Sequence, residues 1–435
     1  MNTKAVSCML GRAGRYAATA LGAAVLALGA FAPTAAQAAA PTTLYVSQGG
    51  LDSGTCTLAS PCATVSYALT QAASGATINV SGTINDHLII SSPVTITTWP
   101  AGPAGSPAVL DGTASGTVVD VSTSGTGVTL HNLTIEHGAV GIQNQGTLTL
   151  TNSTVSGNAS VQSIAGIYNS GTLTIIDSTV AKNSSTGSGG AGIYNTATMT
   201  VIASTISGNT GGGIHSNQLA TVTLGATIVA DNTGPNCDAL GPGSLASVGY
   251  NLTNDTTGSA CRFTAATDLV NKNPLLGPLA SNGGPTQTML PGAKSPAANL
   301  IPKPTTLRGV AVCPSADQRG VARPGHGETR CTIGAAEVGF NKATTTSVTL
   351  SPTTVTAGTR VIYLVVVTPK LGTGTPTGTI SFTTGSKILC TAVLSGGVAA
   401  CGATNAPVGT DTVTGKYSGG NGYASSSGTA TLTVT

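Results

Sequence analysis

Apolar and polar residues alternate along short segments in the middle of the chain, and the segments recur at a nearly constant interval. Four copies align without a gap and begin 25, 26 and 23 residues apart: Gly146–Asn158, Gly171–Asn183, Ala197–Asn209 and Ala220–Asn232. A more divergent fifth copy precedes them and starts at Gly127. A period of this size is typical of solenoids, in which each repeat forms one coil. The pattern therefore predicts a stack of β-strand coils.

Period-two alternation within each copy separates side chains that point inward from side chains that point outward. The inward set is apolar: Leu148, Leu150, Leu173, Ile175, Met199, Val201, Val222 and Leu224, with a second column of Val155, Val180, Ile206 and Val229. The outward set is threonine throughout: Thr147, Thr149, Thr172, Thr174, Thr198, Thr200, Thr221 and Thr223. We expect these eight threonines to lie exposed on one sheet.

Each copy ends on an asparagine, and stacked coils place equivalent residues about 4.8 Å apart. We therefore expect a ladder of side-chain amides at the turn, formed by Asn158, Asn183, Asn209 and Asn232. A second motif, Gly-Ile-x-Asn or a close variant, recurs between the copies and begins at Gly141, Gly166, Gly192 and Gly213. An antiparallel sandwich would not repeat its strands and loops in phase over four copies.

At these residues the chain resembles the secreted right-handed β-helix proteins and the repeats of polymorphic outer-membrane proteins. The resemblance is carried by a glycine-rich element at Gly189–Ile193 and by Ser204–Asn209. The following region is similar to the choice-of-anchor Q domain that commonly closes such helices, at the stretches Gly249-YNLTND, Asn273-PLLGPLASNGG, Asp317-QRG and Cys331-TIGAAE. This resemblance implies a C-terminal cap on the helix.

From about Ala343 the strands become longer and are separated by glycine and proline turns, as in a β-sandwich. We expect strands at Thr346–Leu350, Val361–Thr368, Thr379–Thr383, Ala392–Leu394, Thr412–Tyr417 and Ala430–Val434. The stretches Pro376-TGTISFTTG and Tyr417-SGGNGYASS are similar to bacterial Ig-like repeats of surface adhesins. The predicted fold class is therefore all-β, a right-handed single-stranded parallel β-helix followed by an Ig-like β-sandwich.

Residues 1–38 have the pattern of a signal peptide: basic residues, then the apolar run Ala17–Ala32, then Ala36-Gln37-Ala38 as the cleavage site. The apolar run is shorter than the roughly 20 residues of a membrane span. We therefore expect a secreted or cell-surface protein without a transmembrane span. The expected domains are the β-helix with an N-terminal cap at 39–235, a C-terminal cap at 236–340 and the Ig-like domain at 341–435.

The cysteines that remain after removal of the signal peptide fall into couples that are close in sequence. The couples are Cys56 with Cys62, Cys237 with Cys261, Cys313 with Cys331, and Cys390 with Cys401. An even number of cysteines in an oxidising compartment predicts four disulfides. No CxxC motif is present and the spacings differ widely, so we expect neither a zinc site nor a cofactor.

Charge is sparse, because Asp, Glu, Lys and Arg make up 7% of the chain and the net charge is only +3. No basic stripe gathers along the sequence, which argues against nucleic acid as a partner. The single tryptophan, Trp99, and the few tyrosines offer little material for stacking against sugars. The sequence therefore leaves two candidate ligands, a polysaccharide and a component of a host matrix.

Glycoside hydrolysis needs two carboxylates roughly 5 to 9.5 Å apart. Along the chain the closest acids, Asp231 and Asp238, are seven positions apart. Across coils, Asp177 shares its column with Asn132, Asn152, Ala203 and Ala226, and Glu136 with Ser156, Ala181, Ser207 and Ala230. Each acid is thus expected to stand alone, and we expect no catalytic residues.

Two further groups of titratable residues have structural interpretations. His131, Glu136 and His137 lie in the divergent first copy and are expected to be surface residues without a functional role, because alternation places His131 and Glu136 on opposite faces. Asp317 and Arg319 are expected to form a structural ion pair in the cap. The sequence therefore favours a non-catalytic adhesion or binding protein over an enzyme. A polysaccharide lyase or glycosidase remains one alternative, and an ice-binding protein is another, because the outward threonines resemble the flat T-x-T faces of β-helical ice-binding proteins.

Overall fold

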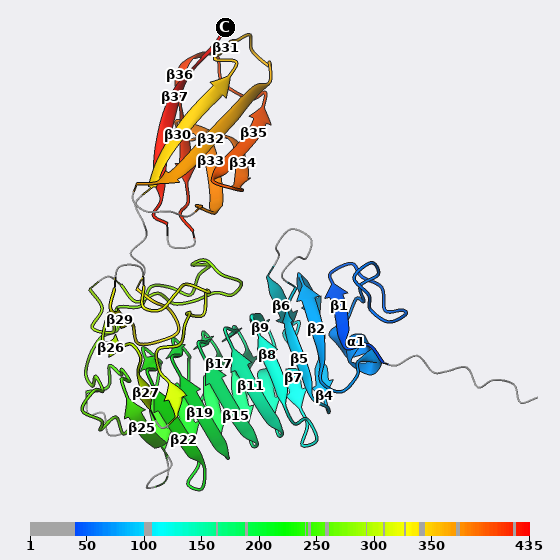
Figure 1. Ribbon diagram of the computed structural model, residues 1–435, viewed down its shortest axis with the longest axis vertical. Coiled ribbons are helices and arrows are strands. Elements are labelled where there is room, and N and C mark those ends of the chain that lie inside the picture. The colour runs from blue at the N-terminus through cyan, green and yellow to red at the C-terminus, as the bar shows by residue number, and fades with distance from the viewer. Residues whose placement is uncertain are drawn as a thin grey trace, which may run out of the picture. The chain divides into compact units, whose positions relative to one another are not determined.

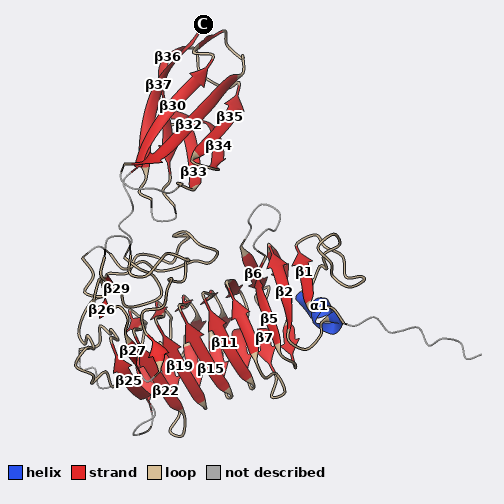
Figure 2. Ribbon diagram, in the orientation of Figure 1, coloured by secondary structure: helices blue, strands red, loops and turns tan. Residues whose placement is uncertain are grey.

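The computed structural model describes residues 40–99, 107–161, 164–187, 190–239, 241, 245–256, 261–292, 294–307, 309–325, 328–338, 344–370, 375–420 and 423–435. The predicted signal peptide at 1–38 lies outside these residues. Within them almost all regular structure is β, and the exception is a short helix, α1 (Val65–Gln71) (Figure 2). No helix in this part of the chain is long and apolar enough to cross a membrane.

Residues 40–249 form a parallel β-helix built from three stacked sheets, whose strands follow one another in chain order (Figure 1). Sheet 1 contains nine strands: β1 (Thr43–Ser47), β2 (Ala76–Ser81), β5 (Val94–Thr98), β8 (Val128–His131), β11 (Thr147–Thr151), β15 (Thr172–Ile176), β19 (Thr198–Ile202), β22 (Thr221–Gly225) and β25 (Leu245–Gly249). Adjacent strands pair in parallel throughout sheet 1. The predicted parallel β-helix is thereby confirmed.

The other two sheets have seven strands each. Sheet 2 contains β3 (Thr83–Asn85), β6 (Ala108–Asp111), β9 (Leu133–Glu136), β12 (Thr154–Ser156), β16 (Thr179–Ala181), β20 (Thr205–Ser207) and β23 (Ile228–Ala230). Sheet 3 contains β4 (Leu88–Ile90), β7 (Thr117–Val121), β10 (Val140–Asn144), β14 (Ile167–Asn169), β18 (Ile193–Asn195), β21 (Ile214–Ser216) and β24 (Cys237–Ala239). The short strands β13 (Ala159–Ser160) and β17 (Ser184–Ser185) pair with each other.

The core of the coils is the apolar column that the alternation predicts. The inward residues of the four repeats are at most 2% exposed, and they belong to one continuous cluster with the inward residues of the earlier coils. Those earlier coils carry the same burial pattern without a recognisable sequence repeat. The reason is that any apolar side chain of suitable volume can occupy an inward position, so the burial pattern is retained while the amino-acid sequence diverges.

The predicted asparagine ladder is present inside the turn. The side-chain amide of Asn158 donates to Asn183, Asn183 donates to Asn209, and Asn209 donates to Asn232, at 2.9 to 3.0 Å. The Gly-Ile-x-Asn motif supplies a second ladder that was not predicted, in which Asn144 donates to Asn169 and Asn169 to Asn195. All of these residues except the partly buried Asn232 are fully buried, so the ladders satisfy amides that would otherwise be costly to bury.

The described residues between 250 and 338 form loops with four short strands, β26 (Ile301–Pro302), β27 (Thr306–Leu307), β28 (Val310–Ala311) and β29 (Arg330–Cys331). This segment, here called the cap, packs on the later coils through a second apolar cluster that includes Ile202, Ile228 and Ile333. Threonines of sheet 2 bond to it directly: Thr154 Oγ1 donates to the carbonyl of Gln287 at 2.6 Å, for example.

Five buried charged residues hold the cap on the coils. Arg323 donates to Asp177 of the coils at 3.1 Å and to Glu337 of the cap at 2.9 Å. Beside it, Arg319 pairs with Asp317 at 2.7 Å, which confirms the predicted structural ion pair. Burial raises the pKa of Asp177 to about 7, and Asp317 and Glu337 add to the effect while Arg323 opposes it. Burial of the Asp177 carboxyl is the main cause of this raised pKa.

The C-terminal domain is a sandwich of two sheets. One contains β30 (Thr344–Ser351), β32 (Val361–Pro369) and β35 (Val398–Ala403), and the other contains β31 (Thr354–Val355), β33 (Gly378–Thr384), β34 (Lys387–Leu394), β36 (Gly409–Tyr417) and β37 (Ser426–Val434). All six predicted strands are present. The strands β31 and β35 were missed, because β31 is only two residues long and β35 is built largely from alanine and glycine.

The four predicted disulfides are formed. Cys56–Cys62 lies at the N-terminal end of the β-helix, next to β1, and Cys237–Cys261 links β24 to the cap. Cys313–Cys331 closes a loop within the cap, and Cys390–Cys401 joins β34 to β35 in the Ig-like domain. Each bridge connects residues close in sequence, as the spacing predicted.

Candidate functional site

The outer face of sheet 2 carries one column of residues that changes character along the β-helix. In register from the first coil to the last, it consists of Asn85, Asp111, Glu136, Ser156, Ala181, Ser207 and Ala230. Asp111 on β6 and Glu136 on β9 are therefore direct neighbours on adjacent coils. The prediction that each acid stands alone was wrong. The column read from the sequence did not include Asp111, because the coil that contains β6 does not resemble the repeats in sequence.

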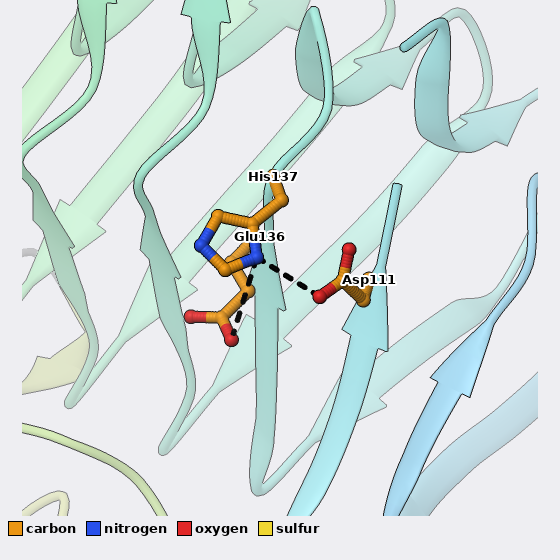
Figure 3. Close-up of side chains that lie close together, drawn as sticks. All are labelled: Asp111, Glu136 and His137. Carbon is orange, nitrogen blue, oxygen red and sulfur yellow. Dashed lines mark hydrogen bonds and ion pairs between the residues drawn. The ribbon is translucent and has the colours of Figure 1, made fainter. Parts of the chain in front are cut away.

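Three side chains converge at this point, as Figure 3 shows. Asp111 and Glu136 are the last residues of β6 and β9, and His137 follows Glu136 directly. Nδ1 of His137 lies 2.9 Å from Oδ2 of Asp111 and 4.0 Å from Oε1 of Glu136. The backbone at His137 is left-handed, with φ at 56°, which interrupts strand alternation. Consecutive side chains can therefore lie on the same side of the sheet.

The three groups shift one another's protonation equilibria in different directions. Burial raises the pKa of Glu136, and nearby Asp111 raises it further while His137 lowers it. Burial would also raise the pKa of Asp111, but hydrogen bonds from His137 and from the backbone N–H of Thr113 lower it overall. The hydrogen bond to Asp111 raises the pKa of His137. Two adjacent acids thus have pKa values displaced in opposite directions.

The cluster borders a cleft of about 390 Å³ on the outer surface. Its lining consists of Asn85, Asp111, Thr113, Ala114, His137, Gly138, Gly157 and Ala159. Gly157 occupies the coil after His137, and a Cβ there would lie 3.5 Å from the imidazole ring, so glycine leaves that side of the ring open. The cleft gives a small molecule or an ion access to His137 and Asp111.

The arrangement permits two kinds of chemistry. One ligand atom from each of Asp111, Glu136 and His137 lies within 4.8 Å of the others, which is close enough for all three to bind a single cation. Alternatively, a carboxyl with a raised pKa beside one with a lowered pKa is the pairing that general acid and nucleophile need. Neither use was expected from the sequence, which predicted no metal site and no catalytic residues.

His131, the third titratable residue of that copy, does not belong to the cluster. It lies on sheet 1 at the end of β8, where its Nδ1 is 2.8 Å from Oγ1 of Thr151 and its Nε2 is 2.9 Å from the amide of Asn132. Burial lowers the pKa of His131. The expectation that His131 and Glu136 alternate to opposite faces was wrong, because both side chains point outward; they are separated because they lie on different sheets.

The eight predicted threonines all point outward from sheet 1, in register. Thr147, Thr172, Thr198 and Thr221 are exposed, whereas Thr149, Thr174, Thr200 and Thr223 are partly buried. The second column continues over four earlier strands through Thr129, Thr95, Thr77 and Thr43. It is therefore twice as long as the sequence repeat indicated. Ligand binding by these threonines stays a prediction.

Sheet 3 carries an aromatic column that sequence reasoning did not identify. The ring centroids of Tyr168 and Tyr194 are 5.8 Å apart, and His215 stacks on Tyr194 at 4.8 Å and 2°. Nδ1 of His215 is 3.1 Å from Oδ2 of Asp238. The recurring Ile-Tyr-Asn of the second motif was the available signal. Because the rings stack on one another, their faces are largely engaged within the column.

Comparison with known proteins identifies one part of the chain. Residues 348–435 match the bacterial Ig-like domain (group 3). The predicted Ig-like domain is thereby confirmed. No curated protein and no solved structure matches the chain, and the comparison with family models gave no match to the choice-of-anchor Q family. The resemblance of the cap to that family therefore stays a prediction. An Ig-like domain and four disulfides together fit an extracellular protein.

Proposed function

We propose that this protein is a secreted or cell-surface binding protein whose β-helix presents the ligand-binding surface. The observation that carries the proposal is one column of eight threonines on sheet 1, which runs in register from β1 to β22. Its members are Thr43, Thr77, Thr95, Thr129, Thr149, Thr174, Thr200 and Thr223. Hydroxyl groups repeat there about every 4.8 Å along the helix axis. A repeating array of hydroxyls suits a repeating hydroxyl-rich ligand, so we assign a polysaccharide to this face.

The supporting features are the Ig-like domain and the low charge of the exterior. Function resides in individual sites rather than in the fold, so the Ig-like domain supports an extracellular setting and does not identify the ligand. With only 7% charged residues, the β-helix offers neutral hydrogen-bonding surface and little electrostatic attraction. Recognition would then depend on many weak hydroxyl contacts, and affinity would grow with the length of the ligand.

A glycan array probed with mature protein, residues 39–435, tests the proposal. We expect binding to at least one extended polysaccharide, with affinity increasing with chain length. Thr174→Lys and Thr200→Lys would place long cationic side chains on the threonine face and should abolish retention. Gln143→Lys, on the outer face of sheet 3, is the matched control and should bind as the unchanged protein does.

Two results would contradict this assignment. If both threonine variants bound glycans as well as the unchanged protein, the threonine face would not be the binding surface. If the protein bound no glycan on the array, polysaccharide would not be the ligand. Thermal hysteresis or inhibition of ice recrystallisation by the purified protein, lost in the same two variants, would assign the threonine face to ice instead.

A second candidate function, glycoside hydrolysis, is favoured by the Asp111–Glu136 pair. In retaining glycosidases two carboxyl groups about 5 to 5.5 Å apart act as nucleophile and as acid. Glu136, whose pKa is raised by burial, would be the acid, and Asp111, whose pKa is lowered, would be the nucleophile. Binding without turnover is preferred because His137 already hydrogen-bonds to the Asp111 carboxylate. In addition, none of the described residues lining the cleft is a tryptophan, tyrosine or phenylalanine that could stack on a sugar ring.

A further inference from the structure

We propose that Asp111, Glu136 and His137 form a binding site for a divalent transition-metal ion, with Zn²⁺ as the best match. The three side chains come from two adjacent coils, and one ligand atom from each lies within 4.8 Å of the other two. Such an ion would join β6 to β9 at the outer edge of sheet 2. This site is separate from the threonine face and goes beyond the proposed polysaccharide binding.

The donor set favours zinc over the alkaline-earth ions. Zn²⁺ is bound by histidine nitrogen at about 2.0 to 2.1 Å and by carboxylate oxygen at about 2.0 to 2.2 Å, commonly with three protein ligands and a water. Ligand atoms around a tetrahedral ion of that size lie roughly 3.3 Å apart. The separations at His137 Nδ1, 2.9 Å to Asp111 and 4.0 Å to Glu136, bracket that value, so small side-chain rotations suffice. Calcium and magnesium prefer sites made of oxygen alone.

The electrostatics of the cluster independently indicate a cation. In the part of the chain that the structure describes, Asp111 and Glu136 have no ion-pair partner except His137, and the lining of the cleft contains no lysine or arginine. The buried carboxylates under the cap are each paired with arginine, Asp177 and Glu337 with Arg323 and Asp317 with Arg319. Two carboxylates on neighbouring coils repel each other, and a divalent ion between them would remove that repulsion.

The cleft provides what the three side chains lack. An ion with three protein ligands needs a fourth position, and the cleft of about 390 Å³ leaves room for a water molecule there. Asn85 lies one coil before Asp111 in the same column, where its amide can hydrogen-bond to a ligand carboxylate or to that water. Such outer contacts fix the orientation of metal ligands.

Isothermal titration of the mature protein with ZnCl₂, after treatment with EDTA, tests the site. We expect one Zn²⁺ per chain, and at least about tenfold weaker binding after Asp111→Asn, Glu136→Gln or His137→Gln. His137 is exposed and the two acids are partly buried, so circular dichroism is used to verify that the variants remain folded. Co²⁺ titration supplies a second measurement, because four-coordinate Co²⁺ absorbs strongly in the visible range.

The pair His215 and Asp238 provides the matched control. Their nitrogen and oxygen atoms are 3.1 Å apart, but no second carboxylate completes a cluster in the described residues. His215→Gln should leave the titration unchanged. The proposal is overturned if Zn²⁺ does not bind at millimolar concentration, if Ca²⁺ binds more tightly than Zn²⁺, or if binding survives in the three ligand variants or disappears in His215→Gln.

Discussion

Sheet 2 is covered over the later coils by the cap and is open over the earlier ones, and its outward residues differ accordingly. On the covered strands, Thr154, Thr179 and Thr205 exchange hydrogen bonds with cap residues, and the neighbouring column is serine and alanine. On the open strands that same column holds Asn85, Asp111 and Glu136. Small neutral side chains occur in this column where another layer packs, and larger polar or charged ones occur where water reaches the sheet.

Asp177 is the instructive exception in the covered region. It lies in the turn that leads into β16, is only 4% exposed and faces the cap. Arg323, which is fully buried, reaches it from the cap. The acid under the cap is therefore paired with a buried arginine, whereas Asp111 and Glu136 on the open coils share only the exposed His137 as a partner.

The largest effect should follow from removing that counter-charge. Arg323→Met leaves Asp177 and Glu337 buried without their partner, and this should lower the free energy of unfolding by about 3 to 5 kcal/mol. Arg330→Met, at an exposed arginine of the same cap, is the control and should change stability by less than about 0.5 kcal/mol. Chemical denaturation monitored by fluorescence measures both. Equal stabilities of the two variants would show that the ion network does not hold the cap.

The next effect concerns pH and arises from the raised pKa of Asp177, about 7 against an ordinary 3.8. Between these values the folded protein binds more protons than the unfolded chain, so stability falls as pH rises through this range. The contribution of Asp177 is complete below about pH 4 and lost as pH passes 7. Thermal denaturation across this range should show the fall, and Asp177→Asn should flatten it. An unchanged slope in that variant would assign the pH dependence to other groups.

A smaller difference in stability is expected between variants of two threonines that lie on different sheets of the same coil. Thr179 is fully buried under the cap and donates to Oε1 of Gln318 at 2.6 Å, whereas Thr174 points outward on sheet 1. Thr179→Val should cost about 1 to 3 kcal/mol because it leaves a buried acceptor unsatisfied. Thr174→Val should be nearly neutral. If urea denaturation gave both variants the same midpoint, the described contact with the cap would be unimportant.

The smallest effect is expected on the open coils. With metal removed by EDTA, Glu136→Gln should change stability by less than about 0.5 kcal/mol, and in the stabilising direction, because it removes repulsion with Asp111. Differential scanning calorimetry at neutral pH is the measurement. A clear loss of stability would mean that Glu136 forms a structural contact comparable with those under the cap.

Local periodicity explains why much of the fold could be predicted and part of the site could not. The inward column, the Asn158 ladder and the cysteine couples all depend on spacings within one or two coils, which the sequence displays directly. Asp111 was missed because Ala108–Asp111 resembles the repeats only in its alternation of buried and less buried residues. Many sequences have that alternation, so it does not identify the segment as another coil. The partnership of Asp177 with Arg323 joins residues 146 positions apart, for which no local pattern exists.

The claim that this is a binding protein and not an enzyme is tested most directly by measuring retention and turnover together. Mature protein is incubated with pectin, alginate, chondroitin and bacterial exopolysaccharides in the presence of Ca²⁺ and Zn²⁺, and bound polysaccharide, unsaturated products and reducing ends are quantified in the same samples. We predict retention of at least one polysaccharide with no products above a blank. Product formation that is abolished by Glu136→Gln would contradict the account and establish the Asp111–Glu136 pair as a catalytic site.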